Sequence, residues 1–87
     1  MNQLQGYHLT PIRKGTFGQF SKIEEEWQEL KDAISQGNRI MELAEFSDLL
    51  CAIDGYLKLS FAEKLNISDV IKMMEATQRA FVSGQRK

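Results

Sequence analysis

Hydrophobic residues recur at helical spacing in three segments of this 87-residue chain, and no segment shows the alternation typical of a β-strand. The spacing predicts helices at about residues 20–37, 39–59 and 67–83. The loops between them are short, and short loops favour antiparallel neighbours. The expected fold class is therefore all-α, an antiparallel helical bundle of three main helices.

Local signals mark the ends of these helices. Ser21 followed by Glu24 three residues later forms a capping-box pattern at the start of the first helix. Gly37 is suited to the C-terminal cap of the same helix, because glycine readily adopts a positive φ. The sequence NISD offers Asn66 or Ser68 as the N-cap of the third helix.

The chain is expected to form a single domain over residues 1–87, with an irregular N-terminal arm at 1–19 and a frayed tail at 83–87. Glycine and proline punctuate the arm, which either frays or lies over another part of the molecule. A domain of this size buries only somewhat more than about 60% of its unfolded surface. We therefore expect the bundle to be completed by oligomerisation, as a homodimer or homotetramer.

Charge is segregated along the chain. All the acidic residues lie between positions 24 and 75, whereas Arg13, Lys14, Arg79 and Arg86 lie towards the two ends. The basic ends would suit an anion, or they reflect ordinary drift of charge at termini. The net charge of -1 argues against a nucleic-acid partner. No run approaches the ~20 apolar residues that span a bilayer, and the start lacks a signal-peptide core, so we expect no membrane partner and a cytoplasmic location.

The second predicted helix is apolar on two sides. One side carries the stripe expected to face the core, formed by Leu43, Phe46, Leu50, Ile53 and Leu57. The other side carries Glu45 and Asp48, three residues apart, beside further apolar residues. A helix that is apolar on both sides is normally buried on both sides. These two carboxylates are therefore expected in an enclosed place.

The first predicted helix carries a second pair of carboxylates at the same spacing. Glu26 and Glu29 share one strip of this helix, while Glu24 lies well away from it and Glu25 lies between the strip and solvent.

Buried carboxylates cost several kcal/mol unless they are paired, hydrogen-bonded or bound to a cation. Ion pairing to Lys31, Arg39 or Lys58 would explain one or two of the acids, and so would a face that is only half covered. A divalent-cation site explains both pairs together. Carboxylate oxygens without a nearby His or Cys suit Mg²⁺, with Mn²⁺ as a substitute, and such Mg²⁺ usually serves phosphate chemistry.

This pattern resembles the MazG-like all-α nucleoside triphosphate pyrophosphohydrolases, in which an E-x-x-E pair is followed by an E-x-x-D pair on the next helix. Here EWQE supplies Glu26 and Glu29, and EFSD supplies Glu45 and Asp48. The flanking Lys22-Ile23, Leu30 and SDLLCAIDGYL also resemble the family, over roughly residues 20–82. The short chain and its GTFGQFSKIEEE lead-in are similar to compact phage variants, which work in the host cytoplasm.

The resemblance implies Mg²⁺-dependent hydrolysis of a nucleoside or deoxynucleoside triphosphate to the monophosphate and pyrophosphate. Glu26, Glu29, Glu45 and Asp48 would hold the metal, and a metal-activated water would attack the α-phosphorus.

Glu25 completes the Glu-Glu start of the family motif and would orient the water or a ligand; the alternative is an exposed helix glutamate. The chain departs from the family at Ser47, where glycine is usual, and at Arg79 and Arg86, which are out of register for phosphate contact within one subunit. The alternative function is a non-catalytic helical interaction module, or a nucleotide-binding module, with the same fold.

Overall fold

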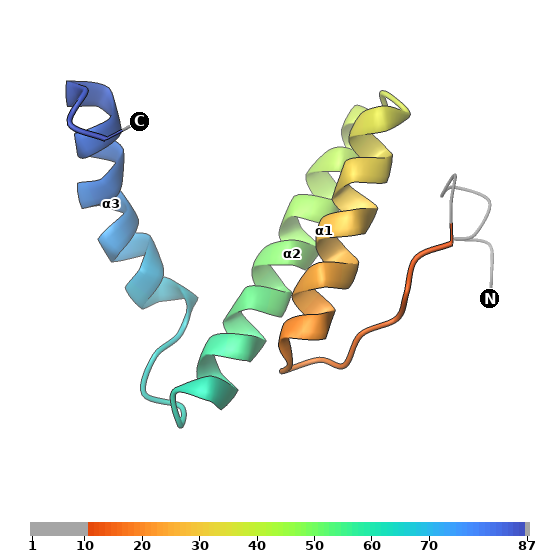
Figure 1. The fold of residues 1–87 in the computed structure, drawn as a ribbon, viewed down its shortest axis with the longest axis horizontal. Coiled ribbons are helices and arrows are strands. Elements are labelled where there is room, and N and C mark those ends of the chain that lie inside the picture. Colours follow the sequence, from red (N-terminus) through yellow and green to blue (C-terminus); the bar gives the residue numbers. More distant parts are fainter. Residues whose placement is uncertain (1–10, 87) are drawn as a thin grey trace.

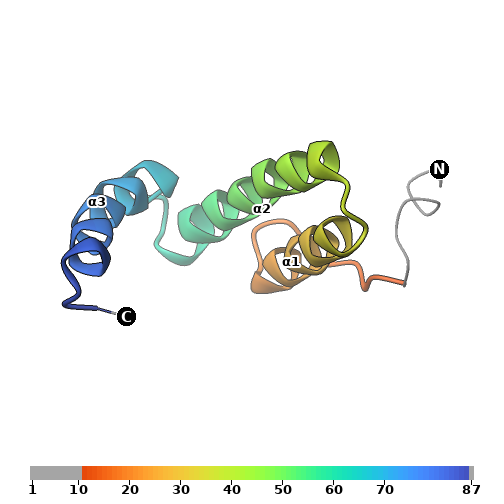
Figure 2. The ribbon, with the colours of Figure 1, turned by 90° about the horizontal axis from the view of Figure 1, so that it is seen from above.

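The computed structural model describes residues 11–86 and contains three helices over that range. These are α1 (Phe20–Ser35), α2 (Arg39–Ser60) and α3 (Ile67–Ser83), and no strand occurs among the described residues. The all-α class is therefore confirmed. Helices α1 and α2 lie side by side and run in opposite directions, whereas α3 stands apart beyond the end of α2 (Figures 1 and 2). None of these helices is both long and apolar enough to cross a membrane.

The start of α1 differs from the predicted capping box. Gln19 occupies the cap position and makes no side-chain cap hydrogen bond. Ser21 lies inside the first turn, where its Oγ accepts a hydrogen bond from the N–H of Thr16 at 3.0 Å. The capping-box prediction is wrong because the Ser21 hydroxyl holds the preceding arm instead of the helix end.

The other two predicted caps are present. Gly37 has a φ of +70°, and its N–H donates to the carbonyl oxygen of Ile34 at 3.0 Å, which closes the end of α1. At the start of α3, the Asn66 side chain accepts the N–H of Ser68 at 2.8 Å. The Asp69 side chain accepts the N–H of Asn66 at 2.9 Å, so a capping box is formed around Asn66.

The core lies between α1 and α2. Its buried apolar side chains are Leu30 and Ala33 from α1 and Ala52 from α2. Two of the three are alanine, which lets the two helix backbones approach closely. Beside this core, the ring of Phe20 packs edge-on against Tyr56 with centroids 5.9 Å apart.

The predicted core-facing side of α2 is wrong for the single chain. Leu43 is 72% exposed and Leu50 is 50% exposed, whereas Glu45 is buried against α1. Because α2 is apolar on both sides, hydrophobicity alone does not select the face that packs. The side with Ala52 and Gly55 is selected because small residues permit closer packing.

Helix α3 is loosely attached. It has no buried residue, and its apolar side chains Met73 and Phe81 are 69% and 48% exposed. A hydrogen bond holds its start to α2: the N–H of Ile67 donates to Oδ1 of Asp54 at 2.8 Å. At its other end, Gly84 has a φ of +84° and ends the helix. The chain therefore leaves apolar faces on α2 and α3 without a covering element among the described residues.

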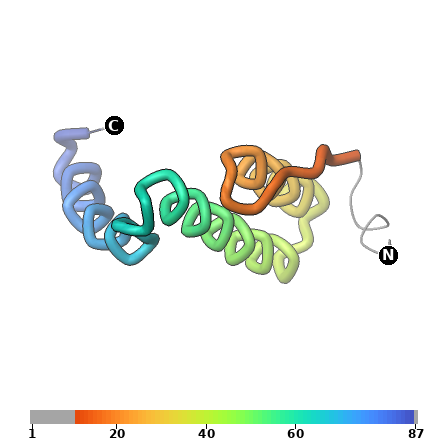
Figure 3. The backbone as a smooth tube through the Cα atoms, turned by 90° about the horizontal axis from the view of Figure 1, so that it is seen from below, coloured from red at the N-terminus to blue at the C-terminus, as the bar shows by residue number. Residues whose placement is uncertain are grey.

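The described part of the N-terminal arm, residues 11–19, runs beside α1 and turns at the start of that helix (Figures 1 and 3). Phe17 lies over Gly55 so closely that a Cβ on Gly55 would be 2.5 Å from Cζ of Phe17. Of the two alternatives for the arm, this part therefore lies over the molecule. Residues 1–10 of the predicted arm, and Lys87 of the predicted tail, lie outside the described residues.

Candidate metal centre

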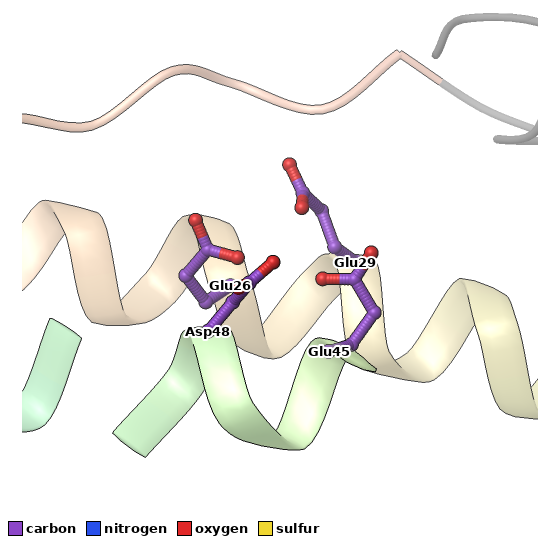
Figure 4. A group of neighbouring side chains, drawn as sticks. All are labelled: Glu26, Glu29, Glu45 and Asp48. Carbon is purple, nitrogen blue, oxygen red and sulfur yellow. The ribbon is translucent and has the colours of Figure 1, made fainter. Parts of the chain in front are cut away.

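The two predicted carboxylate pairs meet between α1 and α2 (Figure 4). One carboxylate oxygen from each of Glu26, Glu29, Glu45 and Asp48 lies within 4.8 Å of the others. The i, i+3 spacing places each pair on one face of its helix, and the packing of α1 on α2 brings the two faces together. We refer to these four side chains as the carboxylate cluster.

The four members of the cluster differ in exposure. Glu26 and Glu45 are buried, at 5% and 4% exposure, whereas Glu29 is half-buried and Asp48 is exposed. Oε1 of Glu26 and Oε1 of Glu45 are buried and have no hydrogen-bond partner. Buried carboxylate oxygens without a donor are costly, and either a proton or a cation at these two oxygens would lower that cost.

Crowding changes the pKa values of two members. Burial, together with the negative charges of Glu26 and Glu45, raises the pKa of Glu29 to about 8. Burial also raises the pKa of Glu45, and the charges of Asp48 and Glu26 act in the same direction. Without a cation Glu29 therefore retains its proton near neutral pH, and a bound divalent cation would displace it.

The cations considered as partners for these acids lie elsewhere. Nη1 of Arg39 lies 3.4 Å from Oε1 of Glu42, and Nζ of Lys58 lies 3.0 Å from Oδ2 of Asp54. Nζ of Lys31 lies over the ring of Trp27, 5.7 Å from the ring centroid.

Sequence analysis missed the cation that does contact the cluster. Nζ of Lys22 lies 3.0 Å from Oε2 of Glu26 and 3.2 Å from Oε1 of Glu25. Burial lowers the pKa of Lys22, but the hydrogen bonds to Glu26 and Glu25 raise it above 10.5. Its i, i+3 and i, i+4 spacing to these two glutamates was a signal that could have identified it.

Glu25 is buried, at 3% exposure, so the alternative of an exposed helix glutamate is wrong. Its Oε1 accepts the N–H of Gly15 at 2.8 Å, and its Oε2 lies 3.5 Å from Nζ of Lys14. Burial raises the pKa of Glu25, but these donors and Lys22 lower it below 4.5. Glu25 therefore attaches the arm to α1 and is not one of the four converging carboxylates.

The basic residues of the C-terminal segment are not near the cluster. Arg79 is exposed on α3, and the guanidinium of Arg86 lies 5.4 Å from the ring centroid of Phe81. Both belong to the segment that stands apart from α1 and α2 (Figure 1). Ser47, where the family usually has glycine, is exposed on α2.

The donor set fits a hard divalent cation. All four ligands are carboxylates, and neither His nor Cys belongs to the group. Two buried ligands and two ligands that reach solvent leave room for waters or substrate oxygens, as Mg²⁺ requires. No protein-family model matches this sequence, and the comparisons with curated proteins and with solved structures found no similar protein.

Proposed function

We propose that the chain is a Mg²⁺-dependent nucleoside triphosphate pyrophosphohydrolase of the MazG-like type. The observation that carries the proposal is the convergence of four carboxylates from α1 and α2 within 4.8 Å, with a buried, partnerless oxygen on each helix. Lys22 pairs with Glu26 through Oε2 alone, so this ion pair leaves Oε1 of Glu26 without a donor. The spacing of the four acids, similar to the family motif, supports the same assignment.

In this proposal the protein's own groups position the reactants. Buried Glu26 and Glu45 would hold the cation together with half-buried Glu29 and exposed Asp48. Mg²⁺, or Mn²⁺ in its place, would supply charge that neutralises the phosphates and lowers the pKa of the water that attacks the α-phosphorus. Lys22 remains beside Glu26 and offsets part of the negative charge of the site. Glu25 acts by holding Lys22 and the arm in place.

We also propose that the enzyme is a homo-oligomer in which a second copy completes the antiparallel bundle. The exposed side chains of Leu43 and Leu50 on α2 and of Met73 and Phe81 on α3 support this. Apolar faces of this kind are normally covered.

The experiment is to incubate the purified protein with Mg²⁺ and each of the common ribo- and deoxyribonucleoside triphosphates, and to measure pyrophosphate. We expect release from at least one of them, lost in EDTA. Glu26→Gln and Asp48→Asn should reduce turnover by about 100-fold or more, because changing a group that only hydrogen-bonds to a metal ligand already costs 10- to 100-fold. Glu42→Gln, which lies on α2 like Asp48 but outside the cluster, should leave turnover unchanged.

No pyrophosphate from any nucleotide, with folded protein and Mg²⁺ present, would contradict the proposal. The exposed apolar faces also favour a second candidate, a non-catalytic interaction or nucleotide-binding module. Nucleotide binding without turnover would favour the binding module. The absence of both nucleotide binding and turnover would favour the interaction module.

A further inference from the structure

The described part of the arm is fixed to α1 by consecutive residues. The N–H of Gly15 donates to Oε1 of Glu25 at 2.8 Å, and the N–H of Thr16 donates to Oγ of Ser21 at 3.0 Å. The next residue, Phe17, lies over Gly55 of α2. These contacts hold the preceding residues, which include both cations of the arm, in place beside α1.

A cavity of about 590 Å³ lies between the arm and α1. Its lining includes Arg13 and Lys14 from the arm, and Glu24, Glu25 and Gln28 from α1. The volume is within the range of sites that bind small molecules, about 300 to 1,000 Å³. The lining combines apolar Pro11 and Ile12 with charged side chains of both signs, so an ionic ligand would find partners there.

The cavity and the carboxylate cluster share no lining residue, and a lysine links them. Glu25 lines the cavity, and Lys22 joins it to Glu26 of the cluster with contacts of 3.2 and 3.0 Å. In Figure 4 the arm passes the cluster on the side towards which the carboxylate of Glu29 extends. The cavity wall at Glu25 is therefore one ion pair away from the cluster.

Charge determines which part of a substrate belongs in this cavity. A nucleoside triphosphate brings several negative charges to a cluster that is itself acidic, so cations besides the metal are needed near its terminal phosphates. Lys22 is already shared between two carboxylates. Arg13 is exposed, and the side chain of Lys14 is 84% exposed and contacts a carboxylate only at 3.5 Å, so both can turn to a phosphate.

We propose that this cavity binds the pyrophosphate part of the substrate, with Arg13 and Lys14 as phosphate ligands supplied by the same chain. This inference rests on the proposed function and names the group that binds the leaving product. The arm then contacts the substrate phosphates. Arg79 and Arg86 do not fill that role within the chain, because they belong to the separate C-terminal segment. Glu24, exposed at the cavity wall, opposes an anion and limits its affinity.

The test measures binding of inorganic pyrophosphate in the presence of Mg²⁺ by isothermal titration calorimetry. Arg13→Gln and Lys14→Gln should each weaken binding about tenfold, and the double variant about 100-fold, because each removes a charge-assisted contact. Glu24→Gln should strengthen binding severalfold. Arg39→Gln is the matched control, since Arg39 lies at the start of α2 beside Glu42, and it should change nothing.

Two further titrations, one with Mn²⁺ alone and one with a nucleoside monophosphate, separate the possible outcomes. Binding of Mn²⁺ alone should be equal in wild type and in the arm variants, which shows that the cluster is intact. Unchanged pyrophosphate affinity in the double variant would overturn the inference. Weakened binding of a nucleoside monophosphate, with pyrophosphate unaffected, would also overturn it and assign the cavity to the nucleoside.

The inference and the proposed function can fail separately. If the protein releases pyrophosphate from no nucleotide but binds pyrophosphate through the arm, the proposed function fails and the anion site stands. If turnover occurs and the arm variants leave both KM and pyrophosphate inhibition unchanged, the inference fails and the proposed function stands.

Discussion

Replacing Glu45 by Gln should have opposite effects on stability with and without metal. The four converging oxygens of the carboxylate cluster, one from each residue, lie within 4.8 Å of one another. At that distance and an effective dielectric constant of 20, two ionised carboxylates repel by about 3 kcal/mol, and partial exposure reduces this to about 1 to 2 kcal/mol. At pH 9 Glu29, with a pKa of about 8, is ionised. Glu45→Gln should therefore raise the free energy of unfolding of the metal-free protein by about 1 to 2 kcal/mol.

With metal the order should reverse. Mg²⁺ at about 100 times its dissociation constant stabilises the wild type by about 2.7 kcal/mol. If loss of one ligand weakens binding about 100-fold, the same Mg²⁺ concentration stabilises Glu45→Gln by only about 0.4 kcal/mol. The variant should thus be more stable than wild type in EDTA and less stable in Mg²⁺.

The assay is urea unfolding followed by circular dichroism at 222 nm, at pH 9 and one protein concentration, in EDTA and in Mg²⁺. Glu42→Gln is the control, because it removes a carboxylate from the same helix that pairs with Arg39 outside the cluster. The reasoning is refuted if Glu45→Gln is destabilised in EDTA, or if Mg²⁺ stabilises it as much as it stabilises wild type.

Three further predictions follow from the described contacts. The pKa of Glu29 is raised from 4.5 to about 8, so the metal-free protein should lose stability as pH rises from 5 to 8; urea titrations check this, and a rise or a flat profile would contradict it. Asn66→Ala removes the capping box of α3 at a cost of about 1 kcal/mol, so amide exchange in α3 should accelerate about fivefold, and unchanged exchange would show that the cap is not needed. Leu50→Lys places a charge on the exposed apolar face of α2, so sedimentation should show smaller assemblies with helicity retained; an unchanged assembly would place the interface elsewhere.

The helices and the two i, i+3 carboxylate pairs were predictable because both depend on local patterns. The N-cap at Asn66, one of the two residues proposed for it, and the glycine at the end of α1 are read from neighbouring residues. The pairs Glu26 with Glu29, and Glu45 with Asp48, need only the helical period and a short turn between two helices.

The packing face of α2 and the role of Glu25 were not predictable from local pattern. Apolar residues on both sides of α2 left two possible faces, and close packing at Ala52 and Gly55, a tertiary effect, selected between them. Glu25 is buried because the backbone N–H of Gly15, ten residues earlier, donates to it. A backbone donor in an irregular arm leaves no signal in the residue types.

The most direct test of the central claim is hydrolysis of a nucleoside triphosphate in ¹⁸O-labelled water with Mg²⁺, followed by ³¹P NMR of the products. Attack at the α-phosphorus, with the carboxylate cluster holding the metal, predicts label in the monophosphate, unlabelled pyrophosphate, and no reaction in EDTA. Label in pyrophosphate or in orthophosphate, or hydrolysis that persists in Glu26→Gln and Asp48→Asn, would contradict the account.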